Sequence, residues 1–530
     1  MAFDYRIMQI ILADCGYHHA KGKDILVTAS NWRRVRQIFQ ALFLGIYLYL
    51  LFAALPQRAA FPLADLFFRL DPLAAIGATL ASRTWIPGLA LALIVLALTI
   101  AFGRVWCGWL CPLGTLLEWV RFRSAGLRAE NLSPSLRKFG VILLFVVLVA
   151  AMLGNLTLFI LDPLTLLTRT MTTVVLPALN TSVTAFERAL YGIPALRPVV
   201  NALERLLRGT VLPVEQPVFS QSVFIAAVFA GVLALNALAD RFWCRFLCPL
   251  GALLRLLAKI SFFRPVIDDT CKACARCLQV CRVGAIETEP TYEIAPSECT
   301  VCLDCFEACR PGDIQFQLMW KPDSIRSYDP TRREVLTAMA SGALGVAILQ
   351  TGVHRRLHHP LLLRPPGVED ENSFLARCLR CSQCMRVCPT SGLQPVLVES
   401  GAEGLWTPRL VPRLGYCDFG CNACGQSCPS GALPALDLTR KREAVIGIAH
   451  IDPERCLPWA KELPCIVCEE MCPTPEKAVK LEEVIVTHPI DSASLIQRPS
   501  VLEHLCIGCG ICEYKCPIEG DAAIRVRIIR

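Results

Sequence analysis

Six groups of four cysteines constrain this chain more than any other feature of its sequence. Four groups share the spacing C-x2-C-x2-C-x3-C: Cys271/Cys274/Cys277/Cys281, Cys299/Cys302/Cys305/Cys309, Cys378/Cys381/Cys384/Cys388 and Cys506/Cys509/Cys512/Cys516. Two groups have a longer first gap: Cys417/Cys421/Cys424/Cys428 and Cys456/Cys465/Cys468/Cys472. Sulfur atoms held so close together suit metal ligation rather than a disulfide framework. We therefore expect six [4Fe–4S] clusters on these 24 cysteines.

Zinc is the alternative ligand for cysteines at this spacing. Zinc sites use two separated C-x2-C pairs, often with histidine, and the repeated third cysteine fits that pattern poorly. In ferredoxins the fourth cysteine of a run ligates the neighbouring cluster. For the first block we therefore expect crossed ligation, with Cys309 completing the first cluster and Cys281 the second. In the second block the quartets lie further apart, and their spacing leaves the pairing open.

The first half of the chain is apolar enough to predict membrane spans. Hydrophobic residues make up 54% of the sequence and charged residues 18%. Four segments, 38–55, 86–102, 139–153 and 219–239, approach the roughly 20 apolar residues that a spanning helix needs. A fifth stretch, 156–179, is interrupted by Asp162-Pro163 and Arg169, so we expect it to be re-entrant or surface-lying. Arginines that flank the spans place both ends of this unit in the cytoplasm.

The membrane region contains an internal repeat. Leu70-Asp71-Pro72-Leu73 recurs as Leu161-Asp162-Pro163-Leu164, and a C-x3-C-P-L-G motif occurs in each half. The motif cysteines are Cys107, Cys111, Cys244 and Cys248. On a helix each pair would share one face, so the four thiols could bind a seventh iron–sulfur centre, form redox-active disulfides or remain reduced structural thiols. The Asp-Pro pairs are good helix starts; a role in proton transfer at a quinol site is the alternative.

Several other sites are not expected. None of the eight histidines lies in the four predicted spans and C-x-x-C-H is absent, so we expect no haem. No segment resembles a flavin or nucleotide site. The net charge of +8 is concentrated beside apolar segments, which favours membrane flanks over nucleic-acid binding. Cys15 is expected to be a free thiol.

A twin arginine, Arg332-Arg333, precedes a weakly apolar, small-residue-rich segment over 337–352. This pattern is typical of a signal for export of folded domains. Export after folding would let clusters assemble in the reducing cytoplasm. The segment would then remain as a fifth span and leave the second cysteine block in the periplasm. A short helix in a cytoplasmic linker is the alternative.

These features predict an α-helical membrane domain with four spans, an internal repeat and a fifth span, followed by α+β ferredoxin-like iron–sulfur domains. The expected order is a cytoplasmic N-terminal segment (1–33), the duplicated membrane domain (34–265), a two-cluster ferredoxin module (266–325), the twin-arginine segment and linker (328–366) and a four-cluster ferredoxin domain (367–530). The expected location is the bacterial inner membrane, with the first module cytoplasmic and the second periplasmic.

The chain resembles two known kinds of ferredoxin. Its first 320 residues, with four spans and two C-x3-C-P motifs, resemble NapH-type membrane ferredoxins. The region from about Thr331 resembles NapG/MauM-type four-cluster ferredoxins. The motifs that carry this second resemblance are Cys456-Leu457-x-Trp459, Cys465-x2-Cys468-x3-Cys472-Pro473, Cys506-x-Gly508-Cys509-Gly510-x-Cys512 and Ala522-Ala523-Ile524. Two usually separate proteins are thus expected to be fused here.

The resemblance implies a quinol dehydrogenase subunit, which would pass electrons from membrane quinol through the clusters to a periplasmic reductase or cytochrome. Two alternatives stay open. The MauM resemblance allows an electron donor for maturation of a partner enzyme's cofactor. Electrons could also flow from a cytoplasmic donor across the membrane. No catalytic side chain is identified at this level.

Overall fold

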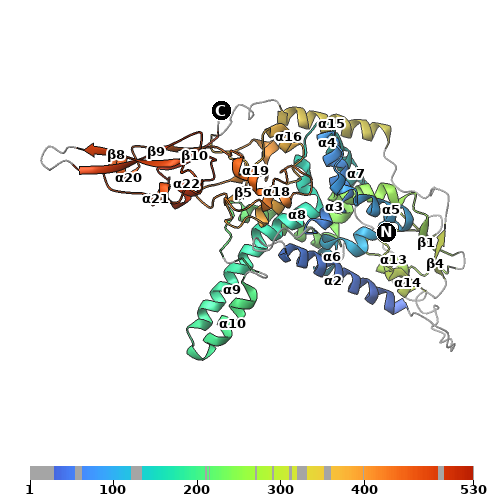
Figure 1. The fold of residues 1–530 in the computed structure, drawn as a ribbon. Helices are drawn as coiled ribbons and strands as arrows, with labels where there is room; N and C mark the ends of the chain where they lie inside the picture. The colour runs from blue at the N-terminus through green and yellow to red at the C-terminus, as the bar shows by residue number, and fades with distance from the viewer. Residues whose placement is uncertain are drawn as a thin grey trace. The chain divides into compact units, whose positions relative to one another are not determined.

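The protein is described here from a computed structural model (Figure 1). It describes residues 29–53, 63–120, 134–208, 212–213, 215–268, 271–288, 292–309, 313–318, 331–350, 360–397, 399–486 and 494–528. Cys15, most of the predicted N-terminal segment and part of the 328–366 linker lie outside these residues. The chain forms two compact units. Unit 1 comprises Met1–Tyr47, Leu91–Phe145 and Ala230–Ala338; unit 2 comprises Leu48–Ala90, Val146–Phe229 and Met339–Arg530.

Unit 1 combines apolar helices with the first cysteine block. Its helical segments are the first part of α2 (Ala29–Ala53), α5 (Ala92–Phe102), η2 (Trp106–Leu110), α6 (Pro112–Trp119), the first part of α7 (Pro134–Met152), the second part of α11 (Ser222–Ala234), η7 (Leu235–Ala237), η8 (Trp243–Leu247), α12 (Pro249–Ala258) and the start of α15 (Arg332–Gln350). The cysteine block has helices α13 (Arg276–Val280) and α14 (Asp304–Ala308). Antiparallel pairs β1 (Phe263–Ile267) with β4 (Ile314–Leu318), and β2 (Ile286–Glu287) with β3 (Glu293–Ile294), frame them.

Unit 2 combines the repeated LDPL segments with the second cysteine block. The former include α3 (Leu66–Arg69), α4 (Pro72–Ser82), η1 (Pro87–Leu89), η4 (Thr157–Leu161), α8 (Pro163–Thr170), η5 (Met171–Val175), α9 (Leu176–Tyr191), η6 (Pro194–Leu196) and α10 (Arg197–Leu207). All eight residues of α8 are buried. This part of the 156–179 stretch is therefore an internal helix of unit 2 and not a surface-lying one.

The second cysteine block is built from short helices and three antiparallel strand pairs. The helical segments are α16 (Glu371–Leu375), α17 (Gln383–Arg386), η9 (Ala402–Gly404), α18 (Ala423–Gln426), α19 (Leu438–Glu443), α20 (Leu457–Ala460), α21 (Val467–Glu470) and α22 (Ile511–Lys515). The pairs are β5 (Leu393–Pro395) with β6 (Pro408–Leu410), β7 (Ile448–Ile451) with β10 (Ile524–Arg527), and β8 (Val479–Val486) with β9 (Ser494–Val501). Cysteines of all four quartets pack in or against one core.

The predicted spans correspond to apolar helices of unequal length. Among the described residues one helix, Trp32–Phe52, is long and apolar enough to cross a membrane. The segments at the other three predicted spans, Pro87–Phe102, Lys138–Met152 and Ser222–Ala237, are shorter apolar helices. The four-span domain therefore remains a prediction.

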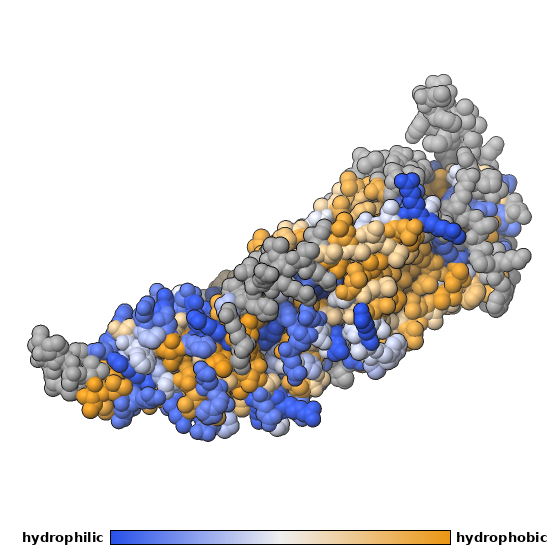
Figure 2. All heavy atoms as spheres, turned by 90° about the horizontal axis from the view of Figure 1, so that it is seen from above, coloured by the Kyte–Doolittle hydropathy of each residue, from blue (hydrophilic) through white to orange (hydrophobic). Residues whose placement is uncertain are grey.

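The borders between the two units fall in these same helices. The chain changes unit five times, within α2, at the start of Pro87–Phe102, and within α7, α11 and α15. Large apolar side chains are exposed on several of them, including Ile38 and Leu42 of α2, Leu93 of α5 and Val223 of α11. Figure 2 shows hydrophobic residues gathered over a broad area of one face. Exposed apolar side chains of this kind are typical of surfaces that contact a partner or a membrane.

Candidate iron–sulfur sites

The four regular quartets fold into the same kind of loop. In each, the residues immediately before and after the second cysteine have positive φ: Ala273 and Ala275, Val301 and Leu303, Arg380 and Ser382, Gly508 and Gly510. Left-handed residues in a tight loop turn successive backbone N–H groups inward and create an anion-binding concavity. Such a concavity suits an iron–sulfur cluster, whose sulfurs accept hydrogen bonds. Shared backbone geometry thus supports a shared function for these quartets.

The first block brings the quartets together in the crossed arrangement. Cys277 lies among Cys271, Cys274 and Cys309, which we call site A. The second group, site B, contains Cys281, Cys299, Cys302 and Cys305. Helices α13 and α14 each end at the fourth cysteine of their own quartet and so deliver it to the other site. This is the grouping that the crossed ligation predicted from the sequence requires.

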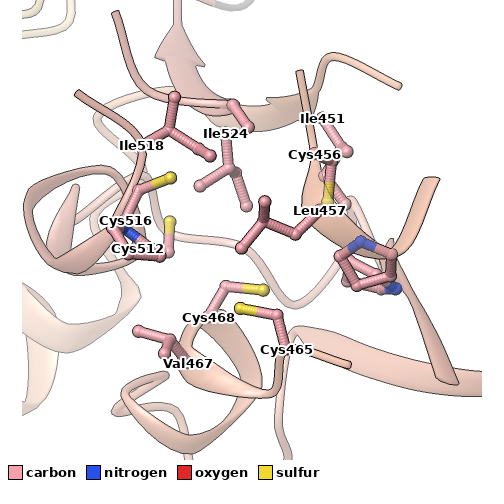
Figure 3. Close-up of a pocket in the computed structure, with 14 residues that line it drawn as sticks. Ile451, Cys456, Leu457, Cys465, Val467, Cys468, Cys512, Cys516, Ile518 and Ile524 are labelled. Atoms are coloured by element: carbon pink, nitrogen blue, oxygen red, sulfur yellow. The ribbon is translucent and has the colours of Figure 1, made fainter. Parts of the chain in front are cut away.

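In the second block, too, the fourth cysteine of each quartet lies with the cysteines of a neighbouring quartet. The spacing in the sequence left this pairing open. Its first two quartets give site C and its neighbour, site D: site C holds Cys378, Cys381, Cys384 and Cys428; site D holds Cys388, Cys417, Cys421 and Cys424. The last two quartets give site E and site F: site E holds Cys456, Cys465, Cys468 and Cys516; site F holds Cys472, Cys506, Cys509 and Cys512. Figure 3 shows the site E cavity, with Cys456, Cys465, Cys468 and Cys516 around it and Cys512 next to Cys516.

Unit 2 arranges its sites in a series. Cys384 of site C lies near Cys424 of site D. The amide of Cys417 in site D donates to the carbonyl of Cys509 in site F, with N and O 2.8 Å apart. Cys512 of site F lies near Cys468 of site E. The order is therefore C, D, F and E, which gives successive steps for an electron.

The ligand spacing favours clusters over single ions. In the part of the chain that the structure describes, no three His, Cys, Asp or Glu side chains lie close enough to hold one metal ion. A cubane distributes four ligands over four irons, so its cysteine sulfurs stand further apart than those around zinc. Burial raises the pKa of the Cys299, Cys468 and Cys509 thiols to about 12. Bound iron would compensate that cost by stabilising the thiolates.

The C-x3-C-P motifs depart from the expected continuous helix. Cys107 lies in η2, a π turn, whereas Cys111 is the N-cap of α6 with extended backbone. The cause is Pro112, because a residue before proline avoids helical geometry. The second half repeats this pattern with Cys244 in η8 and Cys248 as the N-cap of α12. The cap sulfurs accept hydrogen bonds from Gly114 N (3.5 Å) and Gly251 N (3.2 Å).

The two halves nevertheless bring Cys107, Cys111 and Cys244 together inside unit 1. Cys111 lies near both Cys107 and Cys244. Two buried arginines face this group: Arg104, hydrogen-bonded to Cys107, and Arg241, which donates to the Cys107 carbonyl at 3.1 Å. Buried cations and two helix N-termini suit an anionic group bound to these thiols. The residues thus fit a further iron–sulfur centre, next to site B.

Gly108 allows the first block to approach the first motif. A Cβ at this position would lie 2.1 Å from the Thr300 carbonyl oxygen of the site B loop. The indole N–H of Trp109 donates to the next carbonyl, that of Val301, at 2.9 Å. The second half has Arg245 at the equivalent position. Glycine is therefore required at this position in the first motif but not in the second.

Gly108→Ala is expected to weaken this contact by about 1–3 kcal/mol, because the methyl group would force the loop apart. The measurement is the temperature at which the two-cluster module loses its native visible circular dichroism. Gly231→Ala in α11, where a Cβ would meet nothing within 4 Å, is the control. Equal stability of the two variants would contradict the role given to Gly108.

A buried charge network was missed by the sequence analysis. The Glu118 carboxylate forms ion pairs with three guanidinium groups, and the N···O distances are 2.9 Å to Arg36, 2.5 Å to Arg241 and 2.7 Å to Arg282. Arg36 and Arg282 also contact Asp304 of α14. Burial raises the pKa of Glu118, but the guanidinium groups of Arg241 and Arg36 outweigh it, so that its pKa lies below the ordinary value. Arg36 and Arg241, which the sequence places beside predicted spans, take part in this network and hold the first block against the helices of unit 1.

The Asp-Pro pairs are helix N-caps, as the sequence predicted. Asp71 Oδ1 accepts from Leu73 N at 2.8 Å and from Ala74 N at 3.3 Å. Asp162 Oδ2 accepts from Leu164 N at 3.1 Å and from Thr165 N at 2.9 Å. Both aspartates are almost fully buried. A surface cap would leave its second oxygen in water, so this burial asks for a further explanation.

Comparison with known proteins agrees with these sites. A family model described as a 4Fe-4S binding domain matches residues 84–129 and 221–266, which contain the two C-x3-C-P motifs. The methylamine utilization ferredoxin-type protein MauM of Methylorubrum extorquens is 37% identical over 217 residues, covering 39% of this chain and 91% of MauM. The ferredoxin-type protein NapG of Escherichia coli K12 is 36% identical over 195 residues, covering 36% of this chain and 81% of NapG. The chain belongs to the ferredoxin-type MauM/NapG family.

Two further comparisons add to the family assignment. The ferredoxin-type protein NapF of Escherichia coli K12 is 30% identical over 162 residues, covering 30% of this chain and 84% of NapF. No solved structure matches the chain. As a member of the MauM/NapG family, the chain is an iron–sulfur electron-transfer protein. The count of six clusters rests on the quartets themselves.

Proposed function

We propose that this MauM/NapG-type protein is anchored in the bacterial inner membrane, oxidises quinol and passes the electrons to a periplasmic redox partner. The observation that carries the proposal is the series of sites in unit 2. One end of the series lies against apolar segments, and the other lies beneath an exposed loop. Clusters at these sites would accept electrons one at a time; the chain sets where electrons enter and leave.

Site C is the end that lies against the apolar segments. Arg380, between its first two cysteines, donates to Thr157 Oγ1 at 3.3 Å and to the Cys378 carbonyl at 2.9 Å. Arg386 of α17 donates to the carbonyls of Leu50 and Leu51 at the end of α2, at 3.4 and 3.1 Å. A lipid-soluble donor such as quinol would therefore reach site C first.

Site E is the end with an exposed surface. The loop that carries Cys465 and Cys468 also exposes Leu463, Ile466 and Met471, with Trp459 on the preceding α20. An apolar patch directly over a redox centre suits a transient partner, since such partners bind through small interfaces. We propose this patch as the place where electrons leave the chain.

The proposed membrane position is supported by the path of the chain. Four predicted spans, 38–55, 86–102, 139–153 and 219–239, precede the first cysteine block, and α15, the twin-arginine segment, lies between the two blocks. Because each crossing would reverse the side, four crossings would return the chain to the cytoplasm for the first block, and a fifth at α15 would place the second block in the periplasm. The resemblance of the first 320 residues to NapH-type membrane ferredoxins supports the same arrangement, and the C-x3-C-P thiols would hold a seventh centre in unit 1.

The proposal predicts that quinol alone reduces the purified protein. The measurement is bleaching of the visible iron–sulfur absorbance after anaerobic addition of a water-soluble quinol, with dithionite marking full reduction. About 24 irons per chain would support six clusters and about 28 a seventh. Bleaching by dithionite but by no quinol would contradict quinol oxidation. It would favour the alternatives of electron donation during cofactor maturation or transfer from a cytoplasmic donor.

A further inference from the structure

The two aspartates of the internal repeat meet inside unit 2. Asp71 precedes α4 and Asp162 precedes α8, at equivalent positions of the two halves. Their exposed fractions are 0% and 1%, and their carboxyl groups lie within interaction distance of each other. Two separate helix caps do not require such contact. The repeat therefore builds a carboxyl pair as well as two helix starts.

The pair must hold a proton. One oxygen of each carboxyl serves its helix cap, and the others, Asp71 Oδ2 and Asp162 Oδ1, have no N–H or O–H partner among the described residues. A hydrogen bond between two carboxyl groups exists only if one of them is protonated. Two ionised carboxylates in contact, away from water, repel strongly. Burial, and then the neighbouring Asp162 charge, raise the pKa of Asp71 well above its ordinary value, and burial also raises the pKa of Asp162, so the pair shares a proton.

The close approach of the two halves is built into the sequence. A Cβ at Gly77 of α4 would lie 2.0 Å from Phe159 Cζ of η4. Phe159 itself is buried, with an exposed fraction of 1%. Glycine at position 77 therefore lets η4, and with it Asp162, pack against α4. The carboxyl pair follows from this packing.

A buried arginine lies between the pair and site C. Arg169 lies on α8, two turns after Asp162, and its charge is near Asp162, Arg380 and Cys381 of site C. Its guanidinium carbon stands 3.9 Å above the Trp406 ring. Nη2 donates to the Ile160 carbonyl at 3.2 Å, whereas Nε and Nη1 have no partner among the described residues. The indole nitrogen of Trp406 is also without one.

These unpartnered atoms have complementary chemistry. Buried polar atoms are normally hydrogen-bonded, so several orphans in one place indicate a missing partner. A carboxylate oxygen has two acceptor sites, so Asp162 Oδ1 can accept a second hydrogen bond besides that of the proton shared with Asp71, whereas Arg169 and Trp406 donate. A hydroquinone offers a hydroxyl that can donate to the carboxylate and an oxygen that can accept from the guanidinium, and its ring can lie beside Trp406. Its electrons would then pass to site C.

We propose that Asp162, paired with Asp71, accepts the protons of a quinol that is held by Arg169 and Trp406 beside site C. This inference rests on the proposed function. In the step, the quinol O–H bond breaks and the proton passes to the Asp162 carboxylate, while one electron would pass to the cluster that the site C cysteines would hold and from there along the series. The pair releases the proton to water, and the second hydroxyl repeats the step. The quinol thereby loses two protons and two electrons and leaves as quinone.

The test compares quinol-dependent and dithionite-dependent reduction in isosteric variants of the full chain. Asparagine at either position keeps an oxygen for the helix cap. Asp162→Asn is expected to slow reduction by quinol on the order of 10²-fold, because it removes the proton acceptor. Asp71→Asn should have a smaller effect, because its amide can still donate to Asp162. Dithionite reduction should remain at the wild-type rate in both.

Asp65→Asn is the matched control, since Asp65 is also buried in unit 2 but pairs with Arg69 at 2.8 Å. It should be reduced by quinol at the wild-type rate. Wild-type kinetics in Asp162→Asn would overturn the proposal. A wild-type protein that no quinol reduces would instead overturn the proposed function.

Infrared spectroscopy provides a readout independent of electron transfer. At neutral pH the protein should show the C=O stretch of a protonated carboxyl group in a dry environment. The band should be lost in Asp71→Asn and retained in Asp65→Asn. An unchanged band in Asp71→Asn would overturn the shared proton, whatever the kinetics.

Discussion

Glu118→Gln is expected to lower the free energy of unfolding of unit 1 by about 3–5 kcal/mol, the range for removing one partner of a buried ion pair. Glu118 is the common acceptor of Arg36, Arg241 and Arg282. With a neutral amide at position 118, the three guanidinium groups would lose their shared carboxylate. Asp304 would still pair with Arg36 and Arg282. Each arginine has lost most of its hydration in the folded state, so the uncompensated charge is costly. We expect the first cysteine block to detach before the rest of the chain unfolds.

The measurement is the urea midpoint at which the detergent-solubilised protein loses the circular dichroism of its first two clusters. Glu307→Gln is the control, because Glu307 is exposed on the same helix as Asp304. Equal midpoints for the two variants would contradict a structural role for the network. A network that only tunes site B would change the reduction potential and leave the midpoint unchanged.

The pH dependence of this effect has a defined sign. The pKa of Glu118 is lowered in the folded state. Its stabilisation is therefore fully present above the unfolded value of about 4.3 and is lost as the pH falls through the folded value. The difference between wild type and Glu118→Gln should be constant near neutral pH and shrink only below about pH 4.

The sequence predicted what is local and missed what depends on packing. The Asp-Pro helix starts were predicted because a cap and its proline act within one turn. That Asp71 and Asp162 meet depends on Gly77 and Phe159, which are far apart in sequence. The duplicated LDPL motif was the available signal, since equivalent positions of a repeat often meet at its interface.

The arginines show the same limit in another way. Arginines beside apolar segments suggest membrane flanks, and Arg36 precedes the first predicted span. Its burial follows from Glu118, a single acidic residue 82 positions away, at the end of α6. Composition counts the charges on a segment but not their partners. A lone glutamate within an apolar, arginine-flanked region was the sign that such a partner exists.

The pairing of the cysteine quartets was predictable from sequence in the first block and not in the second. In the first block the quartets are adjacent, so the ferredoxin arrangement leaves one partner for each fourth cysteine. In the second block, four quartets allow several pairings, and the spacing of one quartet says nothing about its neighbour. In the structure the fourth cysteine of each quartet lies with the neighbouring quartet, as Cys428 does with Cys384 and Cys472 with Cys509. Gly508 packs closely on Gly447, where a Cβ would lie 2.3 Å from the carbonyl oxygen. Gly508 therefore helps to bring the last quartet into place.

Two double variants are expected to give opposite results if ligation in the second block is crossed. Cys378→Ser with Cys428→Ser removes two ligands from site C and none from site D. We expect it to lose one whole cluster, about four irons per chain, while the site D signal is retained. Cys378→Ser with Cys388→Ser removes one ligand from each site. Each cluster then keeps three thiolates, and we expect two altered signals with less iron lost.

The uncrossed alternative reverses these outcomes, which makes the comparison decisive. If each quartet held its own cluster, Cys378→Ser with Cys388→Ser would delete one cluster, and the pair with Cys428→Ser would damage two. The variants are matched, since Cys388 and Cys428 are both partly buried and each ends its own quartet. Iron analysis with EPR of the dithionite-reduced proteins separates the two cases. Crossing also explains the order of the sites, because each fourth cysteine fixes two neighbouring clusters close together, as rapid electron transfer along the series requires.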